Sequence, residues 1–281
     1  MKFLIYLLVL LCVSTSAAAA AQVTALVHKE EKRKYRVYTP ASYASNPEQR
    51  YPVLFNFHGG GMTMAEQLLY TQINKVADRH RFIVVYPSGI KQDWNHIGYT
   101  EALLAKLTQD FRVDSQRVYT TGLSRGGFFA FCAATELPHL FAAVAAVGAP
   151  MPEPVVLHHT KPGKVGMMLI HGTADKVVAY KGKPTGYRSA EAAYNYWLKQ
   201  NGIAAASVAS RLINADAADG TEVVYLGLGN GAQSVALATI KDGGHTWPGA
   251  DGFNVGLPIG MTSRDIDGNE MIWQFLGKHR K

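Results

Sequence analysis

Short apolar runs alternate with helical patterns along most of the 281-residue sequence. Residues 53–57, for example, form a run of the kind found in strands that are buried on both faces. Residues 190–198 instead place their apolar side chains at spacings of three and four, on one face of a helix that ends at Gly202. Strands that alternate with helices favour a mostly parallel sheet covered by helices on both faces. The predicted strands are residues 35–38, 53–57, 82–86, 118–121, 142–147, 165–170, 222–225 and 235–240, and the predicted helices are residues 102–111, 125–135, 190–198 and 270–276.

The first 21 residues have the three parts of a secretory signal peptide. Lys2 provides a positive start, residues 3–13 are almost wholly apolar, and residues 14–21 are rich in small side chains. The apolar stretch is shorter than the roughly 20 residues that a membrane span needs. Cys12 allows a lipid anchor as the alternative, but Leu11 stands where lipoprotein processing requires a small residue. We therefore expect residues 1–21 to be removed, the protein to be secreted or periplasmic, and no membrane contact to remain.

Composition restricts the function classes further. A hydrophobic content of 48% with 17% charged residues is typical of a globular protein that buries a core. Cys132 is the only cysteine after the signal peptide, which excludes an internal disulfide and a cysteine-based zinc site. The net charge of +7 invites a nucleic-acid interpretation, but the only dense cationic cluster, residues 28–34, also contains two glutamates. We therefore expect a solvated basic surface and no nucleic-acid partner.

The pentapeptide Gly122-Leu123-Ser124-Arg125-Gly126 has the pattern G-x-S-x-G. The pattern alone occurs by chance, but here a predicted strand runs directly into it and a predicted helix follows, which is the setting of a nucleophile elbow. Glycines on either side allow so tight a turn and keep side chains away from an approaching substrate. We predict that Ser124 is a nucleophile; the alternative is that it only caps the helix.

A serine hydroxyl is a weak nucleophile and needs a base that is itself held by a carboxylate. In proteins with such an elbow, the acid and then the histidine follow the serine in the chain, on loops after later strands. Asp175 follows the predicted strand 165–170, and the glycine-flanked His245 follows the predicted strand 235–240. Three matches in the expected order predict Ser124, Asp175 and His245 as a catalytic triad.

Other candidates for these roles are weaker. Asp216 and Asp219 lie in a polar region with a turn signal, and His158 and His159 follow no predicted strand. Residues 227–231 resemble a dinucleotide-binding loop, but they lack the G-x-G-x-x-G spacing and a strand follows them, so a hairpin turn is expected. Because no metal-binding motif appears, we expect neither a metal ion nor a cofactor.

Catalysis by such a triad also needs backbone N–H donors for the developing oxyanion. One expected donor is the amide of Arg125, directly after the nucleophile. The other is expected in His58-Gly59-Gly60-Gly61, which follows the predicted strand 53–57. The sequence does not choose between Gly60 and Gly61, and a glycine-rich turn without function is the alternative.

Together these motifs resemble the polyhydroxybutyrate depolymerase and feruloyl esterase family of secreted α/β-hydrolases. The resemblance implies a single α/β-hydrolase catalytic domain over residues 22–281, with Ser124, Asp175 and His245 as the triad and carboxylic esters as substrates. Two features depart from the family pattern: Arg125 replaces a small or amide side chain, and the segment after Asn95 is short. The matching segments, in chain order, are residues 54–61, 86–89, 94–95, 113–119, 121–127, 141–144, 171–175 and 244–249.

The expected activity is therefore hydrolysis of small-molecule or oligomeric esters through an acyl-enzyme. Trp94 and Trp247 are candidates to stack on an aromatic or sugar ring of the substrate, with core packing as the alternative for each. A serine peptidase would use the same triad, and a non-catalytic binding protein is the remaining alternative.

Overall fold

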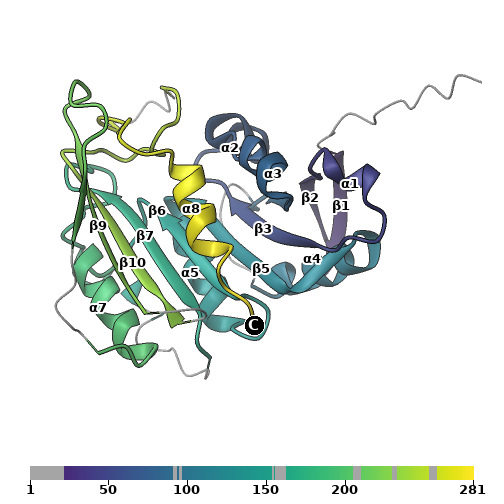
Figure 1. Cartoon of the computed structure of the whole chain (residues 1–281). Coiled ribbons are helices and arrows are strands. Elements are labelled where there is room, and N and C mark those ends of the chain that lie inside the picture. Colours follow the sequence, from purple (N-terminus) through teal and green to yellow (C-terminus); the bar gives the residue numbers. More distant parts are fainter. Residues whose placement is uncertain are drawn as a thin grey trace, which may run out of the picture.

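The computed structural model of the protein describes residues 22–90, 94, 97–153, 155, 163–204, 210–229, 233–252 and 258–281. The predicted signal peptide, residues 1–21, lies outside the described residues, as do Asn95, His158 and His159. Across the described ranges a single sheet runs through the molecule, with helices on both of its faces (Figure 1). The α/β-hydrolase architecture expected from the sequence is confirmed.

The described residues form a ten-stranded sheet in the order β1-β2-β4-β3-β5-β6-β7-β10-β9-β8. Its six neighbouring strands from β4 to β10 are parallel, whereas the two strands at each end are antiparallel. The strands are β1 (Gln22–His28), β2 (Glu31–Tyr38), β3 (Tyr51–Phe57), β4 (Ile83–Pro87), β5 (Val113–Leu123), β6 (Ala143–Val147), β7 (Gly166–Gly172), β8 (Arg211–Ile213), β9 (Glu222–Leu228) and β10 (Val235–Lys241).

The strand order reverses between β3 and β5. The chain passes from β3 to β4 on one side of the sheet and then returns to β5 on the other side of β3. In open α/β sheets, ligands bind beyond the carboxyl ends of the strands at such a switch point. Ser124 directly follows β5, and His58 directly follows β3. The topology therefore places both motifs at the same position on the sheet edge.

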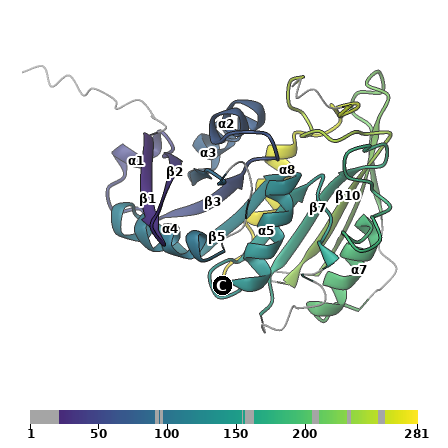
Figure 2. The same ribbon diagram turned by 180° about the vertical axis from the view of Figure 1, so that it is seen from behind.

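Helices cover the two faces of the sheet in separate groups. Helices α2, α3 and α8 contact the strands from one face, and α8 crosses in front of the sheet in Figure 1. Helices α4, α5 and α7 pack on the other face, which Figure 2 turns toward the viewer. The helices are α1 (Ser42–Ser45), α2 (Met64–Thr71), α3 (Asn74–His80), α4 (Ile97–Asp110), α5 (Arg125–Glu136), α7 (Ala190–Gln200) and α8 (Gly268–Leu276).

Each sheet face has its own hydrophobic cluster, and β3 shows how one strand serves both. Val53, Phe55 and Phe57 belong to the cluster under α4, α5 and α7, while Leu54 belongs to the cluster under α3 and α8. All seven residues of β3 are buried. Side chains that alternate between two covered faces explain why this strand has an almost continuous apolar sequence.

All of the predicted strands and helices overlap an observed element, but β1, β8, α1, α2 and α3 are not predicted. Most residues of β1 and β8 are exposed or half-buried, so neither strand carries the apolar run used for the prediction. Helix α2 does carry a start signal, because Thr63 and Glu66 form a capping box. No helix among the described residues is long and apolar enough to span a bilayer.

Candidate active site

Ser124 occupies a sharp turn between β5 and α5. Its backbone lies at φ 55° and ψ −123°, outside the regions that non-glycine residues normally adopt. Such a conformation costs about 1–3 kcal/mol and persists only where the surroundings enforce it. Here the Ser124 N–H donates to the Val147 carbonyl at 3.0 Å, and the Ser124 carbonyl accepts from Phe128 N–H at 2.9 Å. The turn is therefore held from β6 on one side and from its own helix on the other.

The glycine two residues after Ser124 is required by close packing. A side-chain carbon on Gly126 would collide with the carbonyl of Phe57, the last residue of β3. Since α5 must begin directly against the neighbouring strand, only glycine fits there. This contact is the structural reason for the second glycine of the G-x-S-x-G pattern.

Asp175 lies in the loop after β7, where its carboxylate accepts four hydrogen bonds. Oδ1 accepts from the N–H groups of Val177 at 2.9 Å and Val178 at 2.8 Å. Oδ2 lies 2.6 Å from His245 Nδ1 and 3.1 Å from His171 Nε2. Burial alone would raise the pKa of Asp175, but the bonds from His171, His245 and the backbone outweigh burial and hold the pKa well below its usual range.

His245 is fixed in its loop by main-chain bonds to a later segment. Its N–H donates to the Ile259 carbonyl at 2.5 Å, and the N–H of Gly244 donates to the Met261 carbonyl at 2.8 Å. The imidazole itself is buried and packs against Gly148, where a side-chain carbon would lie 3.0 Å from His245 Nδ1. Gly148 has a φ of 57°, so glycine also suits its backbone.

The structure brings the three predicted triad residues to one place. Asp175 is hydrogen-bonded to His245, His245 packs on Gly148, and Gly148 follows Val147, which accepts the Ser124 N–H. Strands β5, β6, β7 and β10, which precede these residues, are neighbours in the sheet. The chain order and the strand order therefore agree on a common site.

The predicted oxyanion loop lies against the elbow. A side-chain carbon on Gly59 would lie 3.7 Å from Ser124 Cβ, and one on Gly60 would lie 2.8 Å from Arg125 Cδ. One on Gly61 would meet nothing within 4 Å. Gly59 and Gly60 thus lie close to the predicted nucleophile and to the residue after it, while the space beside the Gly61 Cα is open.

His58 sets the conformation of this loop. Its Nε2 accepts from the Gly89 N–H at 3.0 Å, so the ring proton lies on Nδ1, which donates to the Gly59 carbonyl at 2.9 Å. Burial lowers the pKa of His58, which favours this neutral form. The sequence indicated a function for the glycines but not for His58. The position of His58 between a buried strand and the glycine run could have indicated its role.

Comparison with known proteins identifies the family of the chain. The family model described as "Putative esterase" matches residues 28–238. The chain belongs to this esterase family. It is an enzyme that acts on ester bonds, and the resemblance to feruloyl esterase-type enzymes is confirmed.

Individual relatives of the esterase are distant. "Putative esterase NocK" of Nocardia uniformis subsp. tsuyamanensis is 26% identical over 276 residues, which cover 87% of this chain and 79% of that protein. "Feruloyl esterase B" of Piromyces equi is 25% identical over 236 residues, covering 76% of this chain and 42% of that protein. "Bifunctional acetylxylan esterase/xylanase XynS20E" of Neocallimastix patriciarum is 29% identical over 157 residues, 53% of this chain and 22% of that protein. The esterase therefore spans less than half the length of the last two.

A solved structure supports the fold over nearly the whole chain. An acetyl xylan esterase from Aspergillus awamori superposes with a TM-score of 0.62 at 15% identity, covering 91% of the esterase and 99% of that chain. At this identity the likeness shows a shared α/β-hydrolase fold.

The esterase's Trp94 lies half-buried against the oxyanion loop. Its Nε1–H donates to the His58 carbonyl at 3.0 Å, and its ring stacks on Phe129 at 5.2 Å. The His58 ring lies 4.6 Å away. These contacts attach the loop to α5, and contact between the indole and substrate stays a prediction.

Replacing Trp94 by Phe is expected to lower kcat roughly tenfold with little change in KM, because the loop loses the bond to the His58 carbonyl while the ring contact with Phe129 remains. Steady-state kinetics on a nitrophenyl ester measures this. Trp273→Phe is the matched control, since Trp273 lies on α8 and stacks on Phe82 on the other face of the sheet. Equal kcat in the wild type and the Trp94 variant would contradict the positioning role.

Trp247 does not have the substrate-stacking position proposed for it. Its side chain is fully buried, and its Nε1–H donates to Asn269 at 2.9 Å. Its backbone N–H donates to the Tyr70 hydroxyl at 3.0 Å. The prediction of substrate contact is therefore wrong for this structure, and core packing is correct, because the loop after His245 turns inward under α2 and α8.

The rival aspartates lie in the connection between β8 and β9 of the esterase. Asp219 accepts from Thr221 N–H at 2.6 Å and from Arg264 N–H at 2.5 Å, which fixes the connection between β8 and β9. Asp216 is exposed in the same connection. Within the described ranges, no group of three or more His, Cys, Asp or Glu side chains has an arrangement that could hold a metal ion.

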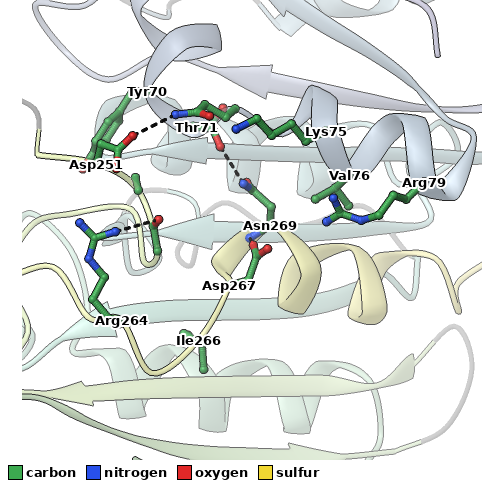
Figure 3. A pocket seen from close by; sticks show the side chains of 13 residues that line it. Tyr70, Thr71, Lys75, Val76, Arg79, Asp251, Arg264, Ile266, Asp267 and Asn269 are labelled. Atoms are coloured by element: carbon green, nitrogen blue, oxygen red, sulfur yellow. Dashed lines mark hydrogen bonds between the residues drawn. The ribbon is translucent and has the colours of Figure 1, made fainter. Parts of the chain in front are cut away.

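A pocket of about 420 Å³ lies between α2, α3 and the segment that leads into α8 (Figure 3). Lys75, Arg79 and Arg264 are among its charged residues, together with Asp251. Arg79 is paired with Glu270, and Gln72 donates to Asp251 at 3.3 Å. None of the predicted triad residues lines this pocket, so it is separate from the site at the elbow.

Proposed function

We propose that the protein is an exported serine carboxylesterase that works through an acyl-enzyme, with Ser124, Asp175 and His245 as its triad. The observation that carries the proposal is the 2.6 Å contact between His245 Nδ1 and Asp175 Oδ2, together with a serine held in a strained elbow. The apolar leader in residues 1–21 supports export.

The hydrogen bonds of Asp175 favour a productive tautomer of His245. The carboxylate is charged at neutral pH, because its pKa is held low, and it can only accept hydrogen bonds. The proton between the two side chains therefore lies on His245 Nδ1. This leaves Nε2 without a proton and able to act as a base.

In the acylation step, His245 Nε2 takes the Ser124 hydroxyl proton as Oγ attacks the ester carbonyl carbon. The backbone N–H groups of Arg125 and Gly60 are the proposed donors to the oxyanion, since Gly60 lies close to the Arg125 side chain whereas Gly61 borders open space. His245 then protonates the leaving alcohol. Water attacks the acyl-enzyme through the same base and releases the acid.

Esters of plant polysaccharides are the proposed substrate class, with feruloyl and acetyl groups as the acyl part. The relatives named as feruloyl and acetylxylan esterases support this class. Hydroxybutyrate oligomers are the second candidate, supported by the motif resemblance to depolymerases. Arg125, with its stem over Gly60, borders the proposed oxyanion site and is the main departure from the family pattern.

A panel of substrates tests the proposal. We expect the enzyme to release acid from nitrophenyl acetate and from methyl ferulate or acetylated xylan. We expect no cleavage of peptide anilides. Hydrolysis of hydroxybutyrate oligomers without the polysaccharide esters would move the enzyme to the depolymerase class. Cleavage of the anilides without any of the esters would contradict esterase function and favour a peptidase.

A further inference from the structure

His171 is a second histidine in direct contact with Asp175. It is the penultimate residue of β7, and its side chain is fully buried. Its Nε2 lies 3.1 Å from Asp175 Oδ2 and 2.8 Å from the Val178 carbonyl oxygen. The proposed mechanism gives this side chain no step.

The contacts of His171 define its protonation. Both neighbours of Nε2 are acceptors, so Nε2 carries a proton and shares it between them. The other ring nitrogen, Nδ1, is buried without a hydrogen-bond partner among the described residues. A donor at Nδ1 would therefore have no acceptor in a buried position.

We propose that His171 is a positioning residue that tunes the catalytic acid: its Nε2–H, divided between Asp175 Oδ2 and the Val178 carbonyl, fixes the carboxylate and makes it a weaker base toward His245. This inference rests on the proposed function, because it assumes that Asp175 and His245 act in catalysis.

The distribution of donors on Asp175 supports this role. Oδ1 is already held by two backbone N–H groups, so these alone anchor the carboxylate in its loop. His171 instead contacts Oδ2, the oxygen that His245 uses. Each donor withdraws charge from that oxygen, and a less basic carboxylate stabilises the protonated imidazole of His245 less.

Few other titratable groups face the pair. The Tyr180 ring lies 5.5 Å from the His171 ring, and its hydroxyl is bonded to Thr239 on β10. Burial raises the pKa of Tyr180, so it stays neutral over the range in which histidine titrates. Lys176, next to Asp175 in the chain, is exposed. Among the described residues, His171 is thus the one side chain besides His245 that is hydrogen-bonded to the carboxylate.

Three substitutions of His171 separate an effect on the basicity of the Asp175 carboxylate from simple structural support of its loop. His171→Leu fills the space without a hydrogen-bond donor. In His171→Asn the side chain is one carbon too short for its NH₂ group to reach the position of the histidine Nε2. His171→Gln places an NH₂ group there, with one hydrogen for each acceptor. The measurement is kcat/KM against pH for a nitrophenyl ester, with the rate of fluorophosphonate labelling against pH as a second readout.

We expect the acid limb of both profiles to move up by roughly 0.5–1 pH unit in the Leu and Asn variants and to return toward the wild-type position in the Gln variant. KM should change little, because His171 is not proposed to contact substrate. An acid limb that stays at the wild-type pH in either folded variant that lacks the donor overturns the proposal.

His279→Leu is the matched control. His279 is also fully buried and bonded through both ring nitrogens, to Ser234 and the Phe275 carbonyl, but it lies beside Gly166 at the opposite end of β7. Its replacement should lower thermal stability without moving the acid limb. Ser124→Ala separates the two hypotheses: activity that survives it contradicts the proposed function, whereas an unmoved limb in the His171 variants contradicts only the role of His171.

Discussion

Replacing Ser124 by Ala is expected to lower kcat for ester hydrolysis by about 10⁵- to 10⁶-fold. The variant lacks the oxygen that forms the acyl-enzyme, while the donors around the elbow and the Asp175–His245 pair remain in place. The fold should persist, because the turn is held by backbone bonds to Val147 and Phe128 that do not use the hydroxyl. Alanine has the same Cβ as serine, so it adds no steric clash at this φ that serine does not already have.

The loss is measured by steady-state kinetics, together with labelling by a fluorophosphonate probe, which should disappear. Ser115→Ala is the matched control, since Ser115 is exposed near the start of β5, at the other end of the same strand. This control should keep full activity and full labelling. Activity of the Ser124 variant near the wild-type level would exclude Ser124 as the nucleophile and with it the acyl-enzyme mechanism.

Replacing Asp175 by Asn is expected to lower kcat by about 10⁴-fold, as loss of the charge does in other triads. Four N–H groups point at the carboxylate, two at each oxygen. The Asn amide has only one oxygen, so its NH₂ must face either the backbone pair or the two histidines. In the second orientation His245 Nδ1 must become an acceptor, which moves its proton to Nε2 and removes the base.

The same substitution is expected to reduce stability in a pH-dependent way. Since the pKa of Asp175 is lowered on folding, its charge contributes stability above its unfolded value of about 3.9, and this contribution is lost as the pH falls toward the folded pKa. The difference in Tm between wild type and Asp175→Asn should therefore be largest near pH 7 and shrink in acid. A difference in Tm that grows as the pH falls would contradict the assigned charge state.

The chemistry-bearing residues were predictable because each motif lies next to a strong apolar strand. Buried parallel strands such as β3, β5 and β7 have continuous apolar sequences, and their carboxyl ends meet at one edge of the sheet. Ser124, Asp175 and His245 could therefore be expected together before their distances were known. Their catalytic roles stay predictions until the variants are measured.

Other features depend on packing that the sequence does not encode locally. Trp247 looked available to a substrate because it follows His245, yet its loop turns inward and buries the indole between α2 and α8. His171 precedes Asp175 by four residues at the end of a strand. A polar residue at the end of a buried strand could have indicated a role in the site, but the prediction did not include it. The edge strands β1 and β8 bury too little to show a periodic pattern.

The proposed catalytic base and the proposed nucleophile are held by different parts of the fold. Ser124 is anchored between strands that contribute to both hydrophobic clusters, whereas the His245 loop is tied by main-chain bonds to Ile259 and Met261 in another loop. Loop–loop bonds open at lower free energy than a central sheet. On warming, the enzyme should therefore lose activity reversibly while its circular dichroism spectrum is still native. The fraction of native secondary structure would then overestimate the fraction of active enzyme.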